Sequence, residues 1–284
     1  MFQSLGQDVR KLAERVEEST LGRSVRRFGS RAYFWLVARN YEHQVFARPT
    51  RTAAGTVLSY ELVNRHRRDP MLAAMAEYCG PTDVIYDVGA NVGMYALALA
   101  TGAPDRRVLA FEPVPGTVDQ LKANVRRNRL ADQIEIHAYG LGAESVTRDC
   151  FVSTLPELSG FDRESATRFG ASLAKRVRVP VRRLDDIVES AQSQDIVESA
   201  QTSDIVGPSQ PPDVVKLDVE GNGPAVLRGG MQTLRAHRPT LFIEIHEEGL
   251  STDPRAELER VLETVPYVID RRDGFWVCQH ESSC

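Results

Sequence analysis

The chain has 284 residues, of which 42% are hydrophobic and 26% are charged, and its formal net charge is −4 at pH 7. This composition is typical of a folded globular protein, and it excludes an intrinsically disordered chain, a collagen-like repeat and a disulfide scaffold. The four cysteines are scattered without a Cys-x-x-Cys spacing, so we expect reduced thiols in a cytoplasmic protein. No apolar run approaches the roughly 20 residues needed to cross a bilayer, so we expect no membrane span.

The first 79 residues read as a basic N-terminal helical extension. Residues 1–70 carry 13 Lys and Arg against 7 Asp and Glu, whereas the rest of the chain carries 22 against 32. Residues 21–39 place apolar side chains at helical spacing and keep Arg23, Arg26 and Arg27 off that stripe, which predicts an amphipathic helix. Such a helix packs on its own acidic domain or makes a peripheral contact with the inner face of a membrane, and the sequence leaves both open. Basic and aromatic residues do not alternate here as they do in RNA-binding segments, so we expect no nucleic-acid partner.

The end of this extension has its own local signals. Residues 50–63 predict a short hairpin, and a helix follows at 70–79 with Pro70 in its first turn.

Residues 80–284 alternate between short β-branched runs and segments of helical length. The expected strands are 84–88, 107–111, 134–138, 214–219 and 240–245, with helices at 92–102, 114–129, 224–236 and 254–264. This alternation predicts an α/β domain with a parallel sheet and helices on both faces. Residues 267–269 and 274–277 are expected to add a closing antiparallel pair.

A long stretch between residues 138 and 214 interrupts this alternation. It contains a candidate strand at 177–181 and a tandem nonapeptide at 186–194, 195–203 and 204–212. Three copies of a nine-residue unit that ends in prolines do not match a solenoid. We therefore interpret 186–212 as a repeat-containing surface insertion.

The most informative segment joins the strand at 84–88 to the next helix. Gly89 and Gly93 flank a tight loop, where backbone amides can approach a ligand at a helix N-terminus. The dinucleotide pattern Gly-x-Gly-x-x-Gly is not met, because Asn91 and Met94 stand at its second and third glycine positions. Asp87 would repel a pyrophosphate but suits an ammonium group.

Glu112 ends the second expected strand, where a carboxylate can accept hydrogen bonds from both hydroxyls of a ribose. A nucleoside that carries an amino-acid end satisfies both this position and Asp87. S-adenosylmethionine is such a nucleoside, so we expect it as the cofactor.

Five segments in this order resemble the FkbM family of S-adenosylmethionine-dependent methyltransferases over about residues 80–247. They are residues 83–93, 111–113, 183–186, 215–221 and 242–246, and Lys-Leu-Asp-Val-Glu-Gly at 216–221 is the most specific of them. The resemblance implies a class I methyltransferase fold, which is a Rossmann-like, mostly parallel seven-stranded sheet with an antiparallel last strand. It also implies O-methylation of a hydroxyl on a sugar, glycoconjugate or natural product.

By the same resemblance, the donor loop is formed by Asp87, Gly89, Ala90, Asn91 and Gly93. Glu112 would bind the ribose, and Gly140 with Leu141 would lie near the adenine. The chain departs from the family after Glu220-Gly221, where the family has a small residue and then Glu but this chain has Asn222, Gly223 and Pro224. The alternative to an enzyme is therefore a non-catalytic S-adenosylmethionine-binding module of the same fold.

Candidate catalytic residues come from the fourth and fifth strands. Side chains two apart point the same way, so Lys216, Asp218 and Glu220 share a face, as do Glu244 and His246. Because these strands are neighbours in the implied fold, the groups should converge at one edge of the sheet.

Methylation of an alcohol by a sulfonium requires that the hydroxyl lose its proton. Glu220, Glu244 or His246 is the expected base, with Asp218 as a fourth candidate catalytic residue. The same groups could instead hold a divalent cation that acidifies the hydroxyl, although no residue is assigned as a metal ligand. In a purely structural interpretation Asp218 caps the next helix and His246 bonds a backbone carbonyl.

Overall fold

The computed structural model describes residues 20–193, 210–246 and 253–281, and the chain divides into two compact units, Met1–Phe46 and Ala47–Cys284. In the first unit, helix α2 spans Thr20–His43 and confirms the helix predicted at 21–39. Asn40 closes its last turns, since its side chain donates to the carbonyl of Phe46 and accepts from the amide of Phe46, each at 2.8 Å. Within the described ranges, every helix is too short or too polar to cross a bilayer.

The second unit begins with an antiparallel hairpin of β1 (Arg48–Thr52) and β2 (Gly55–Ser59), followed by helix α3 (Pro70–Tyr78). Asp69 caps α3 by accepting from the amide of Leu72 at 3.0 Å. Val57, Leu72 and Met75 are buried in the same core as helix α4 (Met94–Gly102). The boundary predicted at residue 79 therefore lies at Phe46 in the structure, because the apolar side chains of β2 and α3 form part of the main core.

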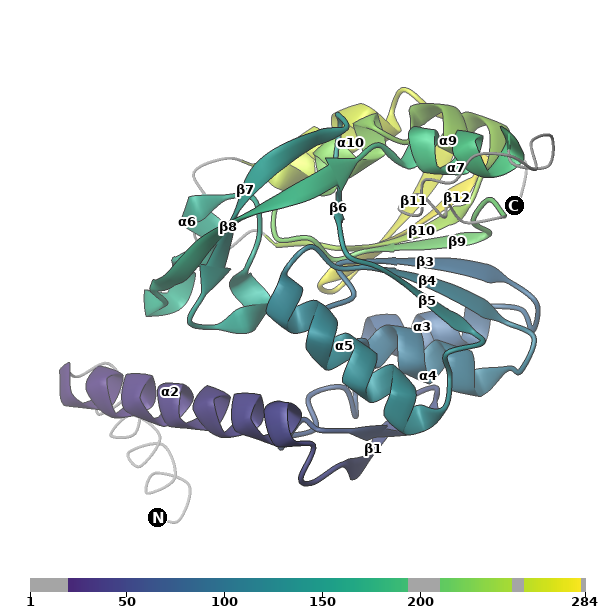
Figure 1. Ribbon diagram of the computed structural model, residues 1–284. Coiled ribbons are helices and arrows are strands. Elements are labelled where there is room, and N and C mark those ends of the chain that lie inside the picture. Colours follow the sequence, from purple (N-terminus) through teal and green to yellow (C-terminus); the bar gives the residue numbers. More distant parts are fainter. Residues whose placement is uncertain (1–19, 194–209, 247–252, 282–284) are drawn as a thin grey trace, which may run out of the picture. The chain divides into compact units, whose positions relative to one another are not determined.

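A seven-stranded sheet carries the second unit (Figure 1). Its order is β11-β12-β10-β9-β3-β4-β5, and β10, β9, β3, β4 and β5 run parallel. Strand β12 pairs antiparallel with both β10 and β11, which confirms the predicted antiparallel end of the sheet. The strand bounds are β3 Val84–Val88, β4 Arg107–Phe111, β5 Ile134–His137, β9 Val214–Leu217, β10 Thr240–Glu244, β11 Tyr267–Arg272 and β12 Phe275–His280.

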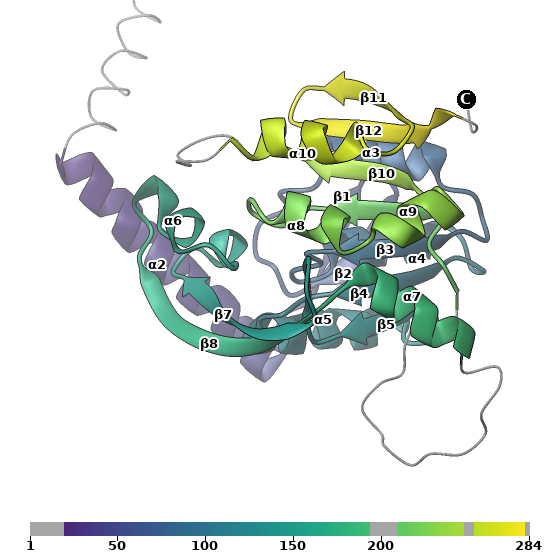
Figure 2. The same ribbon diagram turned by 90° about the horizontal axis from the view of Figure 1, so that it is seen from above.

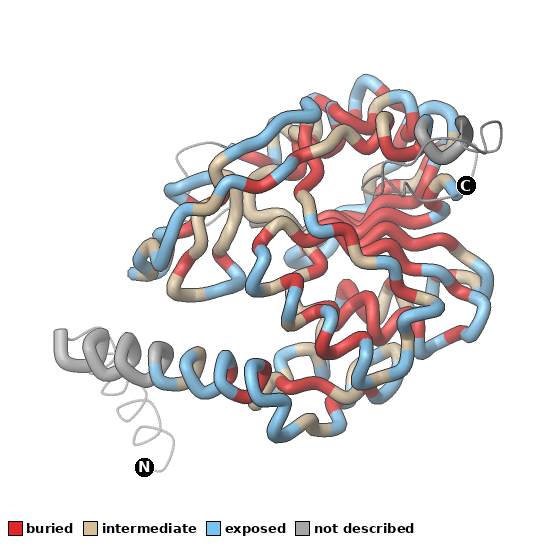
Figure 3. Tube along the Cα trace, in the orientation of Figure 1, coloured by how far each residue is buried: buried red, intermediate tan, exposed pale blue. Residues whose placement is uncertain are grey.

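Helices cover both faces of this sheet, as the alternation of elements predicts (Figure 1). Helices α3, α4 and α5 (Pro115–Asn128) lie on one face, and α7 (Leu184–Ser193), α8 (Gly223–Arg228), α9 (Met231–His237) and α10 (Pro254–Leu262) lie on the other. The strands between the two helical layers are the most continuously buried part of the chain (Figure 3).

The helix predicted at 224–236 is divided into α8 and α9 at Gly229 and Gly230. A Cβ on Gly229 would lie 2.0 Å from the carbonyl oxygen of Gly142, so the backbone approaches too closely for any side chain there.

The long stretch between β5 and β9 forms a second, smaller sheet of order β6-β8-β7 (Figure 2). Its strands are β6 (Gly140–Leu141), β7 (Val146–Ser153) and β8 (Leu173–Arg182), and β8 contains the strand predicted at 177–181. Between β7 and β8 lie three short helices, η1 (Pro156–Leu158), α6 (Arg163–Ala166) and η2 (Arg168–Gly170). We call residues 140–182 the insertion; it lies beyond the carboxyl ends of the parallel strands.

The nonapeptide repeat is not a surface tract throughout. Its first copy begins inside α7, where Ile187 and Val188 are buried in the core on the α7–α10 side of the sheet. The prediction that a surface tract starts at residue 186 and runs to residue 212 is therefore wrong at its start, because Ile187 and Val188 lie on the buried side of an amphipathic helix. This tract is separate from the insertion at 140–182. Residues 194–209 of the repeat lie outside the described residues.

Candidate active site

The loop between β3 and α4 has the backbone conformation that its glycines predict. Gly89, Asn91 and Gly93 have φ values of 80°, 51° and 87°, in the left-handed region. A Cβ on Gly89 would lie 1.9 Å from the carbonyl oxygen of Asp218, so only glycine allows β9 to end beside this loop.

The amides of this loop are used within the protein. Gly89 and Ala90 both donate to the carbonyl of Phe111 at 3.0 Å, and Gly93 donates to the carbonyl of Ala90 at 2.8 Å. The sequence predicts that the amides of this loop face a ligand. In the structure the amides of Gly89 and Ala90 instead attach the loop to the end of β4. The role of the loop in donor binding stays a prediction.

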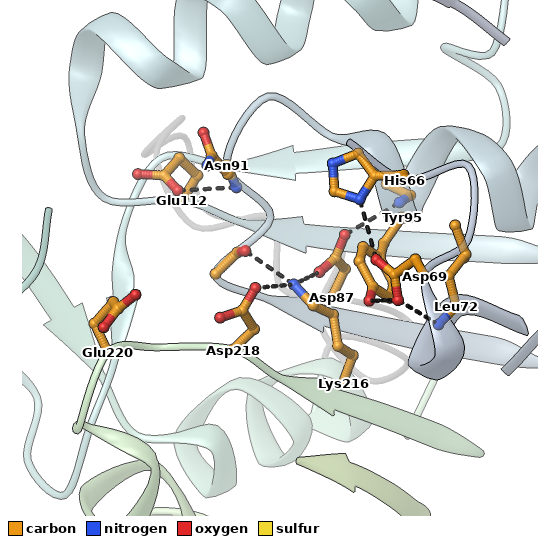
Figure 4. A network of polar contacts seen from close by, with 12 residues as sticks. His66, Asp69, Leu72, Asp87, Asn91, Tyr95, Glu112, Lys216, Asp218 and Glu220 are labelled. Atoms are coloured by element: carbon orange, nitrogen blue, oxygen red, sulfur yellow. Dashed lines mark hydrogen bonds and ion pairs between the residues drawn. The ribbon is translucent and has the colours of Figure 1, made fainter. Parts of the chain in front are cut away.

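Asp87 is completely buried at the end of β3, and its main partner is Lys216 on the adjacent strand (Figure 4). Its carboxylate accepts from Lys216 Nζ at 2.9 Å and from the amide of Ala96 at 3.1 Å. The same Nζ donates to the carbonyl of Gly89 at 3.0 Å and lies 4.8 Å from the ring centroid of Tyr95. Burial alone would lower the pKa of Lys216, but Asp87 and Asp218 outweigh it and hold that pKa above its ordinary value.

This buried network extends to the start of α3. The hydroxyl of Tyr95 donates to Asp69 at 2.7 Å, and Asp69 also contacts Nδ1 of His66 at 3.1 Å (Figure 4). Asp69 therefore ties α3 to the helix that follows the glycine loop, in addition to capping its own helix.

Glu112 lies beside the loop at the end of β4. Its carboxylate accepts from the amides of Asn91 at 3.0 Å and Val114 at 2.8 Å. Burial raises the pKa of Glu112 to about 7, although these two hydrogen bonds act in the opposite direction. The carboxylate is thus positioned at the loop by two backbone donors, at the place where the sequence predicts a ribose.

The two residues predicted near the adenine have different surroundings. A Cβ on Gly140 would lie 2.5 Å from the ring of Phe161, so this aromatic side chain of the insertion packs directly over Gly140. The side chain of Leu141 is buried in the core on the α7–α10 side of the sheet, and its carbonyl accepts from the Asn222 side chain at 2.9 Å. Only the backbone of Leu141 is therefore close to the loop that holds Asn222.

The four predicted catalytic residues converge at the ends of β9 and β10. His246 Nε2 and Asp218 Oδ1 are 3.0 Å apart, and His246 Nδ1 lies 3.8 Å from Glu220 Oε1. Lys216 Nζ is 3.4 Å from the second oxygen of Asp218, and ligand atoms of Asp218, Glu244 and His246 lie within 4.8 Å of one another. The sequence argument from alternating side chains on adjacent strands thus placed these groups together correctly.

The charges within this cluster shift one another. Burial would lower the pKa of His246, but Asp218, Glu220 and Glu244 raise it to about 9, so the imidazole is protonated at neutral pH. Burial raises the pKa of Glu244 to about 7, and the neighbouring Asp218 carboxylate adds to the increase. For Asp218 itself, burial is outweighed by Lys216 and His246, which hold its pKa well below the ordinary range.

These protonation states bear on the metal alternative. Asp218, Glu244 and His246 offer three ligand atoms within reach of one ion. A protonated imidazole has no lone pair to donate, so a cation could bind only after His246 loses its proton.

Two residues of the insertion, neither of them predicted as a site residue from the sequence, contact Glu220. Its carboxylate forms a buried ion pair with the Arg168 guanidinium, and its carbonyl accepts from the Ser165 hydroxyl at 3.4 Å. Glu220 also has a φ of 28°, a strained conformation for a residue with a side chain. No motif surrounds Ser165 or Arg168 in the sequence, so only the folded chain reveals their role.

A cavity of about 480 Å³ opens beside Glu220 and His246. It lies between the insertion, the end of β10, the start of α10 and the β11–β12 turn. Its lining includes Arg168, Glu220, His246, Arg255, Arg272 and Trp276.

The strand order, the antiparallel β12 and the glycine loop after β3 define the fold of a class I methyltransferase. The chain belongs to the FkbM methyltransferase family, because the model of the Methyltransferase FkbM domain matches residues 87–265. This result confirms the family resemblance seen in the sequence.

Individual relatives match different shares of the chain. The 31-O-demethyl-FK506 methyltransferase FkbM of Streptomyces tacrolimicus is 39% identical over 31% of this chain and 34% of its own length. The hexuronic acid methyltransferase AglP of Haloferax volcanii is 29% identical over 67% of this chain and 69% of its own length. The match to the AMB antimetabolite synthetase AmbE of Pseudomonas aeruginosa covers only 4% of that protein.

Among solved structures, the methyltransferase FkbM of Methylobacillus flagellatus KT aligns with a TM-score of 0.47 and 18% identity. The alignment covers 85% of this chain and 50% of that one. The O-methyltransferase of Bacillus cereus in complex with SAH aligns with a TM-score of 0.39 and 17% identity, covering 70% and 74% of the two chains.

Proposed function

We propose that the protein methylates an oxygen atom of a small-molecule or saccharide acceptor, with S-adenosylmethionine as the methyl donor. The observation that carries this proposal is the cavity lined by Glu220 and His246. His246 bonds Asp218, whose carbonyl lies against Gly89 of the glycine loop, so the cavity and the loop meet at this cluster. Two relatives bear names that refer to a demethylated oxygen and to a hexuronic acid, which supports an oxygen acceptor and a sugar as one class of substrate.

Donor binding is assigned to the residues at the ends of β3 and β4. Glu112 is the ribose ligand, because its carboxylate is already oriented by the amides of Asn91 and Val114. Asp87 acts on the loop through Lys216, which holds the Gly89 carbonyl. When bound, S-adenosylmethionine supplies an electrophilic methyl group on a positively charged sulfur.

Glu220 is the residue that we assign as the proton acceptor. It lines the cavity, it is a carboxylate, and burial raises its pKa above that of an ordinary glutamate, which makes it a stronger base. His246 is protonated and bonded to Asp218, so it serves to orient Glu220 and to stabilise its negative charge. In the reaction the acceptor oxygen gains the methyl group, its proton passes to Glu220, and the donor leaves as a neutral thioether.

Transfer of a tritium-labelled methyl group from S-adenosylmethionine into cell extract tests this proposal. Glu220→Gln should abolish transfer while donor affinity, measured by calorimetry, stays at the parental value. Glu144→Gln, which changes an exposed glutamate, is the matched control and should leave transfer unchanged. A folded protein with no affinity for S-adenosylmethionine or its demethylated product would refute the proposal.

Donor binding without transfer in any extract would favour the non-catalytic module instead. The observation that favours this second candidate is the segment Asn222-Gly223-Pro224, where the family has a small residue and then Glu. In this chain Asn222 bonds the carbonyl of Leu141, and Gly223 stands at the position of the acid.

The membrane contact of residues 21–39 and the location of the protein at the inner membrane face also remain proposals. Sedimentation with anionic liposomes at low and high salt tests them. Binding that is lost at high salt and in the triple variant Arg23, Arg26, Arg27→Ser would support a peripheral contact, and no binding at low salt would refute it.

A further inference from the structure

The charged side chains of the cavity are unevenly distributed between its interior and its mouth. Arg168 is buried and pairs with Glu220, whose side chain is 11% exposed, whereas Arg255 and Arg272 are exposed. The other titratable residues that line it are His246, which is protonated, and Asp273. Among the described lining residues, cationic groups therefore outnumber carboxylates, and two of the guanidiniums are exposed.

Arg255 packs against an aromatic side chain of the sheet. It lies in the first turn of α10, and its guanidinium carbon is 5.6 Å from the ring centroid of Trp276 on β12. A guanidinium within about 6 Å of an indole centroid is attracted by the ring through a cation–π interaction. Trp276 is itself buried, so Arg255 has a packed aromatic partner at the cavity.

Arg272 reaches the cavity from the end of β11. Its guanidinium lies 5.7 Å from the ring centroid of Phe275 and forms an exposed ion pair with Asp270 at 2.8 Å, and the side chains of this pair are 46% and 58% exposed. An exposed pair of this kind contributes only about 0–1 kcal/mol, so Arg272 can exchange it for a ligand at little cost.

We infer that the acceptor carries a carboxylate or phosphate group, which Arg255 and Arg272 bind at the mouth of the cavity while its hydroxyl faces Glu220. This inference rests on the proposed function, since it takes the cavity as the acceptor site. Two guanidiniums that converge on one anion form charge-assisted, bidentate hydrogen bonds, which a neutral acceptor cannot replace. The anion also fixes which end of the acceptor enters first, and it therefore selects the hydroxyl that meets the base.

Binding of three sugars to the protein saturated with S-adenosylhomocysteine tests the inference. Glucuronate carries a carboxylate, glucose 6-phosphate carries a phosphate, and glucose is neutral, so the series separates the anion from the sugar and one anion from the other. We expect at least one anionic sugar to bind about tenfold or more tightly than glucose in saturation-transfer NMR titrations, as charge-assisted hydrogen bonds imply.

Variants of the two arginines make the test specific. Arg255→Gln and Arg272→Gln should each reduce the preference for the anionic sugar, and the double variant should remove it. Arg271→Gln is the matched control, because Arg271 also lies over Trp276, at 5.4 Å, and pairs with Glu259, but it does not line the cavity. This control should keep the full preference.

Three outcomes would overturn the inference: equal binding of anionic and neutral sugars, no detectable binding of either anionic sugar, or a preference that survives in the double variant. A calorimetric titration with S-adenosylhomocysteine on the same samples separates this failure from failure of the proposed function. Donor-product binding without the anion preference overturns the inference alone, and absence of donor-product binding refutes the proposed function.

Discussion

Replacement of Lys216 by Met should destabilise the protein strongly. Lys216 is 2% exposed, and its ammonium group serves the completely buried carboxylate of Asp87, the carbonyl of Gly89 and, at 3.4 Å, the carboxylate of Asp218. Methionine keeps the length and the apolar stem of the side chain, so the substitution removes mainly the charge. The carboxyl group of Asp87 would then be buried with the amide of Ala96 as its remaining hydrogen-bond donor among those shown by the structure.

The expected loss follows from this burial. Removal of one partner from a buried ion pair costs about 3–5 kcal/mol, because the other charge stays without compensation. A protein of ordinary stability has about 5–15 kcal/mol in total, so Lys216→Met should lose about a fifth or more of the free energy of unfolding. The double variant Asp87→Asn with Lys216→Met should be more stable than Lys216→Met alone, since no buried charge is left without a partner.

Urea unfolding followed by circular dichroism at pH 7 measures these differences. Lys122→Met on α5 is the matched control, because Lys122 is exposed, and it should stay within about 0.5 kcal/mol of the parent. A loss below about 1 kcal/mol for Lys216→Met would show that this ion pair is not buried as described. A double variant less stable than Lys216→Met would contradict the assignment of the loss to the charge of Asp87.

Three further predictions concern the donor site, the ion cluster and the repeat. The pKa of Glu112 is raised to about 7, and the carboxylate form accepts hydrogen bonds from the ribose hydroxyls, so donor affinity should increase as pH rises from 6 to 8. Glu112→Gln should weaken donor binding by about 1–3 kcal/mol and remove this pH dependence. Calorimetry at both pH values measures these effects. The pKa of His246 is raised from its ordinary 6.5 to about 9, so its protonation stabilises the fold fully below pH 6.5 and this contribution is lost as pH rises to 9. In urea titrations the free energy of unfolding of His246→Gln should therefore fall less steeply with pH over that interval than that of the parent. An unchanged slope would contradict the ion cluster. Deletion of residues 195–203, the second copy of the repeat, should change the free energy of unfolding by less than about 0.5 kcal/mol, and a larger loss in the same assay would place this copy in the core.

The sequence allowed the central fold to be predicted because its signals are local. Each parallel strand is a short β-branched run, so β3, β4, β5, β9 and β10 were located from composition alone, and Pro70 and Pro254 mark the first turns of their helices. The convergence of Asp218 and His246 followed from side-chain alternation and from the neighbouring positions of two strands.

The features that were missed depend on contacts distant in sequence. The break between α8 and α9 is required by the close approach of Gly229 to Gly142, which no local pattern encodes. The sequence predicts that the basic extension ends at residue 79. The folded chain places Leu72 and Met75 in the main core, and no local pattern in the sequence indicates this long-range packing. The use of the Gly89 amide by Phe111 and the ion pair of Arg168 with Glu220 likewise join segments that are far apart along the chain.

The contacts of Ser165 and Arg168 with Glu220 limit how acceptor specificity can change during evolution. Ser165 and Arg168 come from the same short stretch that forms part of the cavity wall, so one segment both shapes the acceptor site and neutralises the proposed base. A graft of the insertion from another family member would replace the wall and the counter-ion together. Exchange of this segment would therefore succeed only as a unit with a cation at position 168, whereas single changes at the cavity mouth, at positions 255 and 272, leave the base undisturbed and offer the easier route to a new acceptor.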